Sequence, residues 1–271
     1  MRLNTNMTKP SVAILDGDII AYRAAFWADA EGVDELPHRI STDISNWTPE
    51  GTKRIVIAMS CPREVNFRRD FWQSYKLHRE GAKSPDCMEY AIELMWNQMG
   101  SSMESTSTRC VNRLEADDLI GMMVSSGKAI GITVDKDLRQ VPGWHWNPDK
   151  ETEPVLVSQE DADKFFYQQW MTGDSTDNIW GLWKVGPAKA KKVLDSNPRE
   201  EWEQVILKMY EEEDWDKRPE NKRPTLDRTE FALSQARCVR ILRDGDYNKE
   251  TKEISLWTPT WYKTTTLTDK C

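Results

Sequence analysis

Nine acidic residues occur in four short groups along the chain, and each group could contribute ligands for a metal ion. The groups are Asp16 and Asp18; Glu115, Asp117 and Asp118; Asp135 and Asp137; and Asp174 and Asp177. All-oxygen ligands without His or Cys favour hard ions such as Mg²⁺ or Mn²⁺ over zinc. Two such ions held about 4 Å apart would activate a water and stabilise the leaving oxygen in the displacement of a phosphodiester. Because clustered carboxylates would otherwise hold protons, this chemistry predicts an activity that depends on metal.

Two of the groups share one form, an Asp-x-Asp pair directly after an apolar run. Asp16 follows the run 12–15, and Asp135 follows the run 130–134. In open α/β sheets the functional crevice lies beyond the carboxyl ends of the strands, so both pairs are expected at one edge. Each Asp could instead only cap the next helix, and for a single pair the two interpretations are equally supported. Two pairs at one edge favour a site.

The third group lies at the start of a predicted helix. Glu115 and Asp118 are three residues apart on one helical face, with Asp117 beside them. Three like charges in one turn repel one another, although the helix dipole offsets the repulsion in the first turn. A solvated helix start is the alternative interpretation. The apolar residues on both sides, including Leu114 and Leu119, argue against acids that simply face water.

The fourth group forms a turn that leads to a basic segment. Residues 173–178 (GDSTDN) would alone indicate a loop or a calcium-loop lookalike, because the full EF-hand spacing is absent. Residues 181–192 follow as a glycine-bounded hairpin and a helix with Pro187 in its first turn and three lysines close behind. Free N–H groups and positive charge at such a helix start suit a phosphate. An ordinary capped helix with a solvated basic face is the alternative.

The composition limits the number of hydrophobic cores and the cellular environments that the chain fits. A chain of 271 residues with 38% hydrophobic residues can bury one large core or two small ones. No apolar run reaches the ~18 residues that a membrane helix needs, and we expect no signal peptide because residues 1–10 are polar. The five cysteines are scattered and form no CxxC pair, which fits a reducing cytoplasm.

The net charge of −8 at first argues against a nucleic-acid partner, because phosphate-binding proteins are usually basic. That inference depends on where the acids lie. If the nine acids above share one metal site, 36 other acidic residues face 37 basic ones, and the remainder is close to neutral. Net charge therefore excludes neither a DNA partner nor a metal site.

Short buried runs alternate with segments of helical spacing in the first half of the chain. The predicted strands are 11–15, 54–59, 108–111 and 129–134, and the predicted helices are 67–75, 87–99 and 114–125. Such alternation predicts an α/β fold with a mostly parallel central sheet flanked by helices. Residues 144–147 and 155–157 are expected to form a hairpin.

The second half is mainly helical. Helices are predicted at 158–171, 187–194, 199–211 and 227–243, an exposed loop at 212–224 and a closing strand at 254–257. Ser158 begins the first of these helices with Asp161 three residues on, as in a capping box. The expected division is an α/β core at 1–157 and a helical region at 158–271, together forming one continuous catalytic unit.

The acidic motifs and the hairpin resemble, in order and spacing, those of the flap-endonuclease-type 5′ nucleases. They read LDGD at 15–18, EADD at 115–118, TVDKD at 133–137 and GDSTDNI at 173–179. Residues 181–190 look like that family's helix–hairpin–helix (H3TH) element. Residues 67–70 and 75–79 look like the segment leading into its helical arch, expected at about 76–106. Residues 236–257 make the chain similar to the 5′→3′ exonucleases of T-odd phages, so the resemblance covers residues 11–257.

The resemblance implies a PIN-like 5′ nuclease fold with two metal ions and a role for each motif residue. Asp16 and Asp117 would hold the metal nearer the nucleophile. Glu115, Asp135, Asp137 and Asp174 would hold the second, with Asp117 or Asp137 bridging. Asp118 and Asp177 match acidic positions whose role varies in the family, and Asp18 matches the phage relatives only.

The resemblance also implies how DNA would be held. Lys76 and Arg79 would engage the phosphate in catalysis. The other implied DNA contacts are Arg68, Lys83, Lys184, Gly186, Lys189, Lys191 and Lys192. The H3TH hairpin of this family commonly binds K⁺ through main-chain carbonyls.

One position departs from the family pattern. The family usually places an Asp just after the second strand, where residues 58–62 read AMSCP. Either Asp18 or Glu64 replaces that carboxylate, or the first metal has fewer protein ligands and more water. A weakened or altered activity would follow, whereas complete loss is not expected because every other acidic motif is present.

The leading hypothesis is a two-metal 5′→3′ exonuclease that acts on duplex DNA at 5′ ends, nicks or flaps and also removes RNA primers from RNA–DNA hybrids. The runner-up is a structure-specific flap endonuclease or RNase H-like primer remover with the same site. A non-catalytic duplex-binding accessory protein is a third hypothesis, motivated by the missing Asp. A phage-encoded enzyme of this kind would act in the host cytoplasm, in DNA replication or recombination, with replication proteins as candidate partners.

Overall fold

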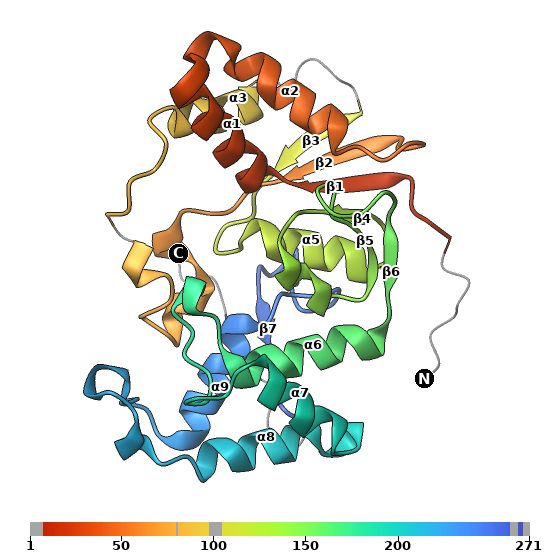
Figure 1. The fold of residues 1–271 in the computed structure, drawn as a ribbon. Coiled ribbons are helices and arrows are strands. Elements are labelled where there is room, and N and C mark those ends of the chain that lie inside the picture. Colours follow the sequence, from red (N-terminus) through yellow and green to blue (C-terminus); the bar gives the residue numbers. More distant parts are fainter. Residues whose placement is uncertain (1–7, 80, 98–104, 261–264, 268–271) are drawn as a thin grey trace. The chain divides into compact units, whose positions relative to one another are not determined.

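The computed structural model describes residues 8–79, 81–97, 105–260 and 265–267 (Figure 1). The chain divides into two compact units. The first consists of Met1–Asn66, Ala82–Gln159 and Ile241–Gly245, and the second consists of Phe67–Gly81, Glu160–Arg240 and Asp246–Cys271. Each unit therefore contains segments that are far apart in the sequence.

A six-stranded sheet forms the centre of the first unit. Its strands are β1 (Val12–Asp16), β2 (Arg54–Ala58), β3 (Thr106–Arg109), β4 (Ile130–Ile132), β5 (Gly143–Trp146) and β6 (Val155–Val157), in the order β3-β2-β1-β4-β5-β6. All neighbouring pairs are parallel except β5 and β6, which form the predicted hairpin. Strands β1, β2 and β4 are nearly continuous runs of buried apolar side chains, as in parallel sheets covered on both faces. The α/β prediction is confirmed.

Helices lie on both faces of this sheet (Figure 1). Helices α1 (Gly17–Glu31), α2 (Leu36–Asn46) and α3 (Met88–Asn97) share one apolar core with inward side chains of β1, β2 and β4. Helix α5 (Ala116–Ser125) packs against β1, β2, β4 and β5. A Cβ atom at Gly131 or Gly143 would come within 2.8 Å of Val124, so these glycines allow α5 to lie directly on the sheet.

Helices α1 and α2 have no clear signal in the sequence. In α1 the exposed face carries Tyr22 and Phe26, so apolar residues occur on all sides and no amphipathic stripe stands out. Helix α2 contains Pro37, a residue that usually indicates a break. The proline lies in the first turn, where its missing N–H costs no helical hydrogen bond.

The second unit is mainly helical, with α6 (Gln159–Thr172), α7 (Pro187–Asp195), α8 (Trp202–Glu211) and α9 (Arg228–Val239). Strands β7 (Ile254–Leu256) and β8 (Thr265–Leu267) form a separate antiparallel pair. The core is aromatic. Trp170 is fully buried and donates from Nε1 to Ala232 O over 2.8 Å, and the Tyr210 hydroxyl donates to Trp170 O over 2.6 Å. These bonds satisfy the polar ends of two large rings inside the core.

Residues 67–75 were expected to be helical, and the structure shows a 3₁₀ turn at Phe67–Asp70 followed by further turns instead. The buried residues Arg68, Trp72 and Tyr75 do have helical spacing, which explains the wrong prediction. The backbone bonds nevertheless change type along the segment, from Trp72 N to Arg68 O and then from Tyr75 N to Trp72 O.

The helix predicted at 227–243 ends earlier, at Val239. Beyond it, Ile241 N donates to Gln140 Oε1 over 2.9 Å and Leu242 N donates to Asp118 Oδ1 over 3.1 Å. These side-chain acceptors replace the helical carbonyls, so the chain leaves the helix and joins the first unit.

Several expectations fall partly outside the described residues. Residues 1–7, 80, 98–104, 261–264 and 268–271 are not described, and the arch expected at 76–106 and the end of the helix expected at 87–99 include some of them. Within the part that is described, no helix is both long enough and apolar enough to cross a membrane.

Candidate active site

Asp16 is the last residue of β1 and lies at the carboxyl edge of the sheet, only 3% exposed. Its Oδ1 accepts a hydrogen bond from Ile19 N over 3.2 Å and so caps α1, while its Oδ2 accepts one from the Thr133 hydroxyl over 2.8 Å. Burial, and then the charges of Asp18 and Asp135, raise the pKa of Asp16 well above its ordinary value. Asp16, Asp18 and Asp135 therefore lie in one electrostatic neighbourhood.

The turn after β4 brings Asp135 and Asp137 to the same edge, because β4 is the neighbour of β1 in the sheet. Asp135 Oδ1 accepts from Asp137 N over 2.8 Å and caps the 3₁₀ turn Lys136–Gln140. Asp135 N donates to Thr133 Oγ1 over 3.1 Å. The Thr133 hydroxyl thus connects Asp16 with this turn. Asp16 and Asp135 also cap the helical elements that follow them. The two interpretations of the Asp-x-Asp pairs, capping and placement at one edge of the sheet, are therefore both correct.

Removing the Thr133 hydroxyl is expected to impair the candidate site without removing any carboxylate. In Thr133→Val, Asp16 Oδ2 and Asp135 N lose their shared partner, and we expect cleavage of duplex DNA to fall by about 10–100-fold, as for other residues that orient metal ligands. Thr133→Ser should retain most of the rate. Thr108→Val is the matched control, because Thr108 lies on the edge strand β3 and its hydroxyl donates to Met95 O. Equal rates for Thr133→Val and Thr108→Val would contradict this role.

The acidic residues at the start of α5 differ in their burial and in their hydrogen-bond partners. Glu115 is the N-cap residue and Asp117 lies in the first turn, both partly buried. Asp118 is fully buried, where Oδ2 accepts from Glu115 N and Oδ1 accepts from Leu242 N, each over 3.1 Å. Both Asp118 oxygens therefore bind backbone N–H groups inside the unit, and a metal-ligand role for Asp118 stays a prediction.

The chemical type of the potential ligands at this edge suits a hard divalent cation. They are carboxylates, and a bound cation would counter both the burial and the neighbouring charges that raise the pKa of Asp16. Among the residues that the structure describes, no group of three or more His, Cys, Asp or Glu side chains could hold a metal ion as it stands. The edge therefore supplies ligands of suitable chemistry without a preassembled coordination shell.

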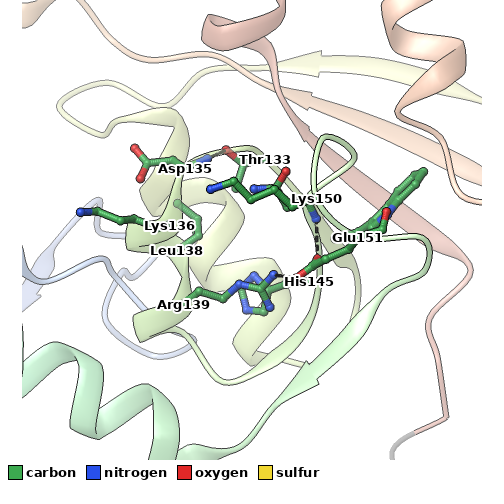
Figure 2. Close-up of a pocket in the computed structure, with 10 residues that line it drawn as sticks. Thr133, Asp135, Lys136, Leu138, Arg139, His145, Lys150 and Glu151 are labelled. Atoms are coloured by element: carbon green, nitrogen blue, oxygen red, sulfur yellow. Dashed lines mark hydrogen bonds and ion pairs between the residues drawn. The ribbon is translucent and has the colours of Figure 1, made fainter.

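A pocket of about 180 Å³ adjoins the Asp135 turn (Figure 2). Its lining carries both signs of charge, and Arg139 forms an ion pair with Glu151. Glu151 Oε2 also accepts from Asn147 N over 2.8 Å. In Figure 2, Asp135 and Lys136 point to one side of the turn, away from Arg139 and Glu151. The ion pair between Arg139 and Glu151 and the hydrogen bond from Asn147 N to Glu151 stabilise the turn that carries Asp135.

His145 in the same lining predicts a pH dependence of stability. It is 2% exposed, its Nε2 lies 2.7 Å from Val141 O, and burial lowers its pKa to about 4 from the ordinary 6.5. Because the unfolded chain binds the proton more readily, the stability that neutral His145 contributes is present above pH 6.5 and is lost as the pH falls towards 4.

We therefore expect the free energy of unfolding of His145→Gln to vary less between pH 7 and pH 4 than that of the wild type. Urea denaturation at several pH values measures this slope. The exposed His38 on α2 provides the control variant His38→Gln, which should keep the wild-type slope. Parallel curves for all three proteins would show that His145 is not the group involved.

The fourth acidic group lies in the second unit. Asp174 Oδ1 accepts from Thr176 N over 2.7 Å and caps the turn Ser175–Asp177. Asp177 is paired with two cations: Arg79 Nη2 lies 2.8 Å from Oδ1 and Lys76 Nζ lies 3.5 Å from Oδ2. Asp177 is thus the counter-ion of both residues predicted to engage phosphate, and its metal-ligand role stays a prediction.

The basic hairpin, residues 181–192, begins at a close contact between two glycines. Gly173 and Gly181 both have positive φ, and a Cβ at Gly181 would lie 2.4 Å from Gly173 N. Helix α7 then starts after Gly186, which has no side chain to cap the first N–H groups. The predicted duplex contacts on this hairpin are all exposed: Lys184, Gly186, Lys189, Lys191 and Lys192.

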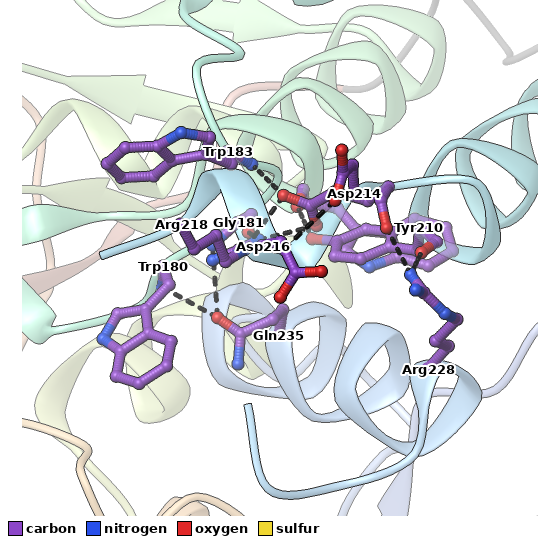
Figure 3. Close-up of polar contacts among 11 residues, drawn as sticks. Trp180, Gly181, Trp183, Tyr210, Asp214, Asp216, Arg218, Arg228 and Gln235 are labelled. Atoms are coloured by element: carbon purple, nitrogen blue, oxygen red, sulfur yellow. Dashed lines mark hydrogen bonds and ion pairs between the residues drawn. The ribbon is translucent and has the colours of Figure 1, made fainter. Parts of the chain in front are cut away.

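Buried polar side chains brace this hairpin from within its unit (Figure 3). Arg218 Nη2 donates to Gly181 O and to Glu213 Oε2, each over 2.7 Å, and Glu213 Oε1 accepts from Trp183 N over 2.8 Å. Gln235 Oε1 accepts from Gly181 N over 3.2 Å. The prediction of an exposed loop at 212–224 is wrong for Arg218, which is 2% exposed. A single arginine in a charged segment carries no sequence signal of burial.

Two other predicted DNA contacts differ in their surroundings. Arg68 is 2% exposed and donates from Nε to Cys238 O over 3.0 Å and from Nη2 to Arg240 O over 2.7 Å. The structure corrects the prediction for Arg68, whose guanidinium ties backbone segments of the second unit together. Lys83 is largely exposed, with Nζ 3.6 Å from Asp86, and its DNA contact stays a prediction.

Comparison with known proteins gives relatives over most of the chain, although no protein-family model matches it. The exodeoxyribonuclease of Enterobacteria phage T3 and the exonuclease of Escherichia phage T7 are each 25% identical, over 92% of this chain and 93% of the relative. The 5′-exonuclease of phage T5, solved with divalent zinc ions bound, has a TM-score of 0.59 at 14% identity and covers 84% of this chain and 88% of its own. A phage T5 flap endonuclease structure, a pseudo-enzyme-product complex with DNA and metal ions, has a TM-score of 0.55 at 13% identity, with coverage of 84% and 85%.

These likenesses agree with the features already described. The T5 structures share the fold, in which a mostly parallel sheet is flanked by helices. The T3 and T7 relatives extend over 92% of the chain. Over nearly its whole length the chain is similar to the phage T3 exodeoxyribonuclease and the phage T7 exonuclease, and it has the fold of the T5 5′-exonuclease.

Proposed function

We propose that this protein is a divalent-metal-dependent 5′→3′ exonuclease of duplex DNA. The observation that carries the proposal is that the Thr133 hydroxyl joins Asp16 Oδ2 to Asp135 N at the carboxyl edge of the parallel sheet. The nearly full-length similarity to the T3 exodeoxyribonuclease and the T7 exonuclease supports it. The T5 structure in complex with DNA and metal ions supports a substrate and a cofactor of the same kinds.

Six carboxylates of the first unit would hold the metal ions: Asp16, Asp18, Glu115, Asp117, Asp135 and Asp137. Two Mg²⁺ ions, or Mn²⁺ in their place, would supply an activated water and stabilise the leaving oxygen of an in-line phosphodiester displacement. The protein's own contribution is to hold the ligands. Thr133 fixes both Asp16 and the Asp135 turn, and burial around Asp16 excludes water from that side of the edge. For Asp174, in the second unit, a ligand role stays a prediction.

The basic hairpin is the proposed contact with the DNA backbone. Uncapped N–H groups at the start of α7 and the exposed Lys189 and Lys192 offer hydrogen bonds and positive charge to phosphates. Lys191 is paired with Asp195, so its charge is partly compensated. Binding of K⁺ by the hairpin carbonyls remains a proposal drawn from the family resemblance.

Lys76 and Arg79 are the proposed ligands of the reacting phosphate. Both are paired with Asp177 in this structure, and the Arg79 side chain is 34% exposed. An incoming phosphate would therefore exchange for a carboxylate that already neutralises these cations. Such an exchange keeps the two cations paired before and after the substrate binds, while the Asp177 carboxylate gives up both partners.

The test uses one duplex with a label at a single 5′ end and a second duplex with the label at a 3′ end. With Mg²⁺ we expect early release of the 5′ label as mononucleotides or short oligonucleotides, late release of the 3′ label, and no release in EDTA. Salt-sensitive duplex binding without cleavage, in Mn²⁺ as well, would contradict the proposal and indicate a DNA-binding accessory protein.

The choice among ends, nicks, flaps and RNA primers is a finer part of the proposal. A matched set of blunt, nicked, 5′-flapped and RNA-primed duplexes of one sequence would resolve it. Faster cleavage of blunt and nicked duplexes supports the exonuclease, whereas a strong preference for flaps, with products cut at the junction, would indicate a structure-specific flap endonuclease.

A further inference from the structure

The ends of β1 and β2 approach each other unusually closely in the first unit. The two strands are parallel neighbours, with Asp16 opposite Ala58. A Cβ atom at Gly17 would lie 2.5 Å from Met59 Sδ and 2.7 Å from Ala58 O. Only glycine fits there, and the next residue, Asp18, is consequently carried against the segment that follows β2.

Ser60, two residues beyond β2, forms hydrogen bonds with Asp18 and with the backbone at the start of α5. Its backbone N–H donates to Asp18 Oδ1 over 3.2 Å. Its hydroxyl oxygen accepts from Ala116 N, the first residue of α5, over 2.9 Å. Ser60 therefore connects the Asp-x-Asp pair of β1 with the acid-rich start of α5.

The neighbours of Ser60 hold the segment in register. Met59 N donates to Arg109 O over 2.8 Å, and Cys61 N donates to Leu114 O over 2.9 Å. The chain from β2 is thus tied both to the end of β3 and to the residues that precede α5. An Asp in the first turn of α1 would be favoured by the helix dipole even if it faced water, so the dipole alone does not explain why Asp18 reaches Ser60.

We propose that Ser60 is a positioning residue and that Asp18, held by it, supplies the carboxylate for the end of β2. The other acid near this segment, Glu64, lies exposed in the 3₁₀ turn Arg63–Val65 and does not compete for this place. The inference rests on the proposed function, because it assigns the carboxylate of Asp18 to metal binding at the candidate site.

The experiment moves the carboxylate from one residue to the other. The variants are Asp18→Ser, Ser60→Asp and the exchange Asp18→Ser/Ser60→Asp, each in the full chain. Binding of Mn²⁺ without DNA is measured by calorimetry, and release of a 5′ label is measured with Mg²⁺. We expect Asp18→Ser to weaken Mn²⁺ binding and cleavage by about 10–100-fold, and the exchange to recover both to within about tenfold of the wild type. Recovery is expected because the exchange returns a carboxylate to the segment that Asp18 contacts, beside the start of α5.

Two further variants test the hydroxyl. Ser60→Ala removes the acceptor of Ala116 N, and we expect a lower kcat at an unchanged KM for DNA, with Ser60→Thr restoring the rate. Ser126→Ala, whose hydroxyl donates to Met123 O near the end of α5, is the matched control and should match the wild type. Thermal denaturation of every variant checks that the fold is retained.

Two results would overturn the inference, and they differ in what else they overturn. If the wild type binds Mn²⁺ and cleaves DNA but the folded exchange variant is as impaired as Asp18→Ser, only the role given to Asp18 and Ser60 fails. If the wild type neither binds Mn²⁺ nor cleaves DNA, the proposed function fails with it.

Discussion

Replacing Asp135 with asparagine is expected to lower kcat for release of nucleotides from 5′ ends by about 10³-fold, because a metal ion contributes several kcal/mol of transition-state stabilisation. Asparagine keeps the size of the side chain and an oxygen that can accept from Asp137 N, so the turn after β4 should survive. What the variant loses is the negative charge that helps to attract a divalent cation.

Single-turnover rates with saturating enzyme measure this effect directly, since product release cannot mask it. Asp34→Asn is the matched control, because Asp34 is exposed in the 3₁₀ turn Val33–Glu35 between α1 and α2 and belongs to none of the acidic motifs. A loss of less than tenfold in Asp135→Asn, with normal rates in the control, would show that Asp135 is not a catalytic metal ligand.

The second large effect is expected at Arg218, which holds the basic hairpin through Gly181 O and Glu213. Arg218→Met should lower the free energy of unfolding by about 3–5 kcal/mol, because removal of one partner leaves Glu213 as an uncompensated buried charge. Gly181 O and Glu213 Oε2 also lose their shared donor. The hairpin that this donor holds should loosen, and duplex binding should weaken at a salt concentration where the wild type still binds.

Urea denaturation followed by fluorescence measures the stability, and Arg223→Met is the matched control in the same segment. Arg223 is exposed and pairs with Asp216 at 3.4 Å, so its loss should cost at most about 1 kcal/mol. The double variant Arg218→Met/Glu213→Met should be less destabilised than Arg218→Met, because no unpaired charge remains. Equal stability of Arg218→Met and the control would contradict the bracing role.

The fold could be predicted where the sequence is locally consistent. The strands β1, β2 and β4 are short β-branched runs buried on both sides, and such runs have few alternatives to a parallel sheet. The same logic placed two Asp-x-Asp pairs at one edge, since the ends of parallel strands coincide. Helix α1 escaped prediction because its apolar residues face both the core and the solvent.

The details of the site depend on contacts that no local pattern encodes. Asp118 looks like its neighbour Asp117, yet it is buried because Leu242, more than a hundred residues later, donates to it. Arg68 and Arg218 look like surface cations, but backbone carbonyls distant in sequence bind their guanidinium groups. Nothing in the sequence around Ser60 predicts a role in the site. Its contact with Asp18 follows from the register of β1 and β2.

The central claim is that the carboxylates at the edge of the sheet hold the metal ions of a nuclease. Its most direct test is electron paramagnetic resonance of Mn²⁺ titrated into the full chain without DNA, which distinguishes bound from free ion. The wild type is expected to bind Mn²⁺, and the variant Asp16→Asn/Asp135→Asn is expected to leave it free while keeping a cooperative unfolding transition. Equal binding by the two proteins would contradict the claim and place the metal elsewhere in the molecule.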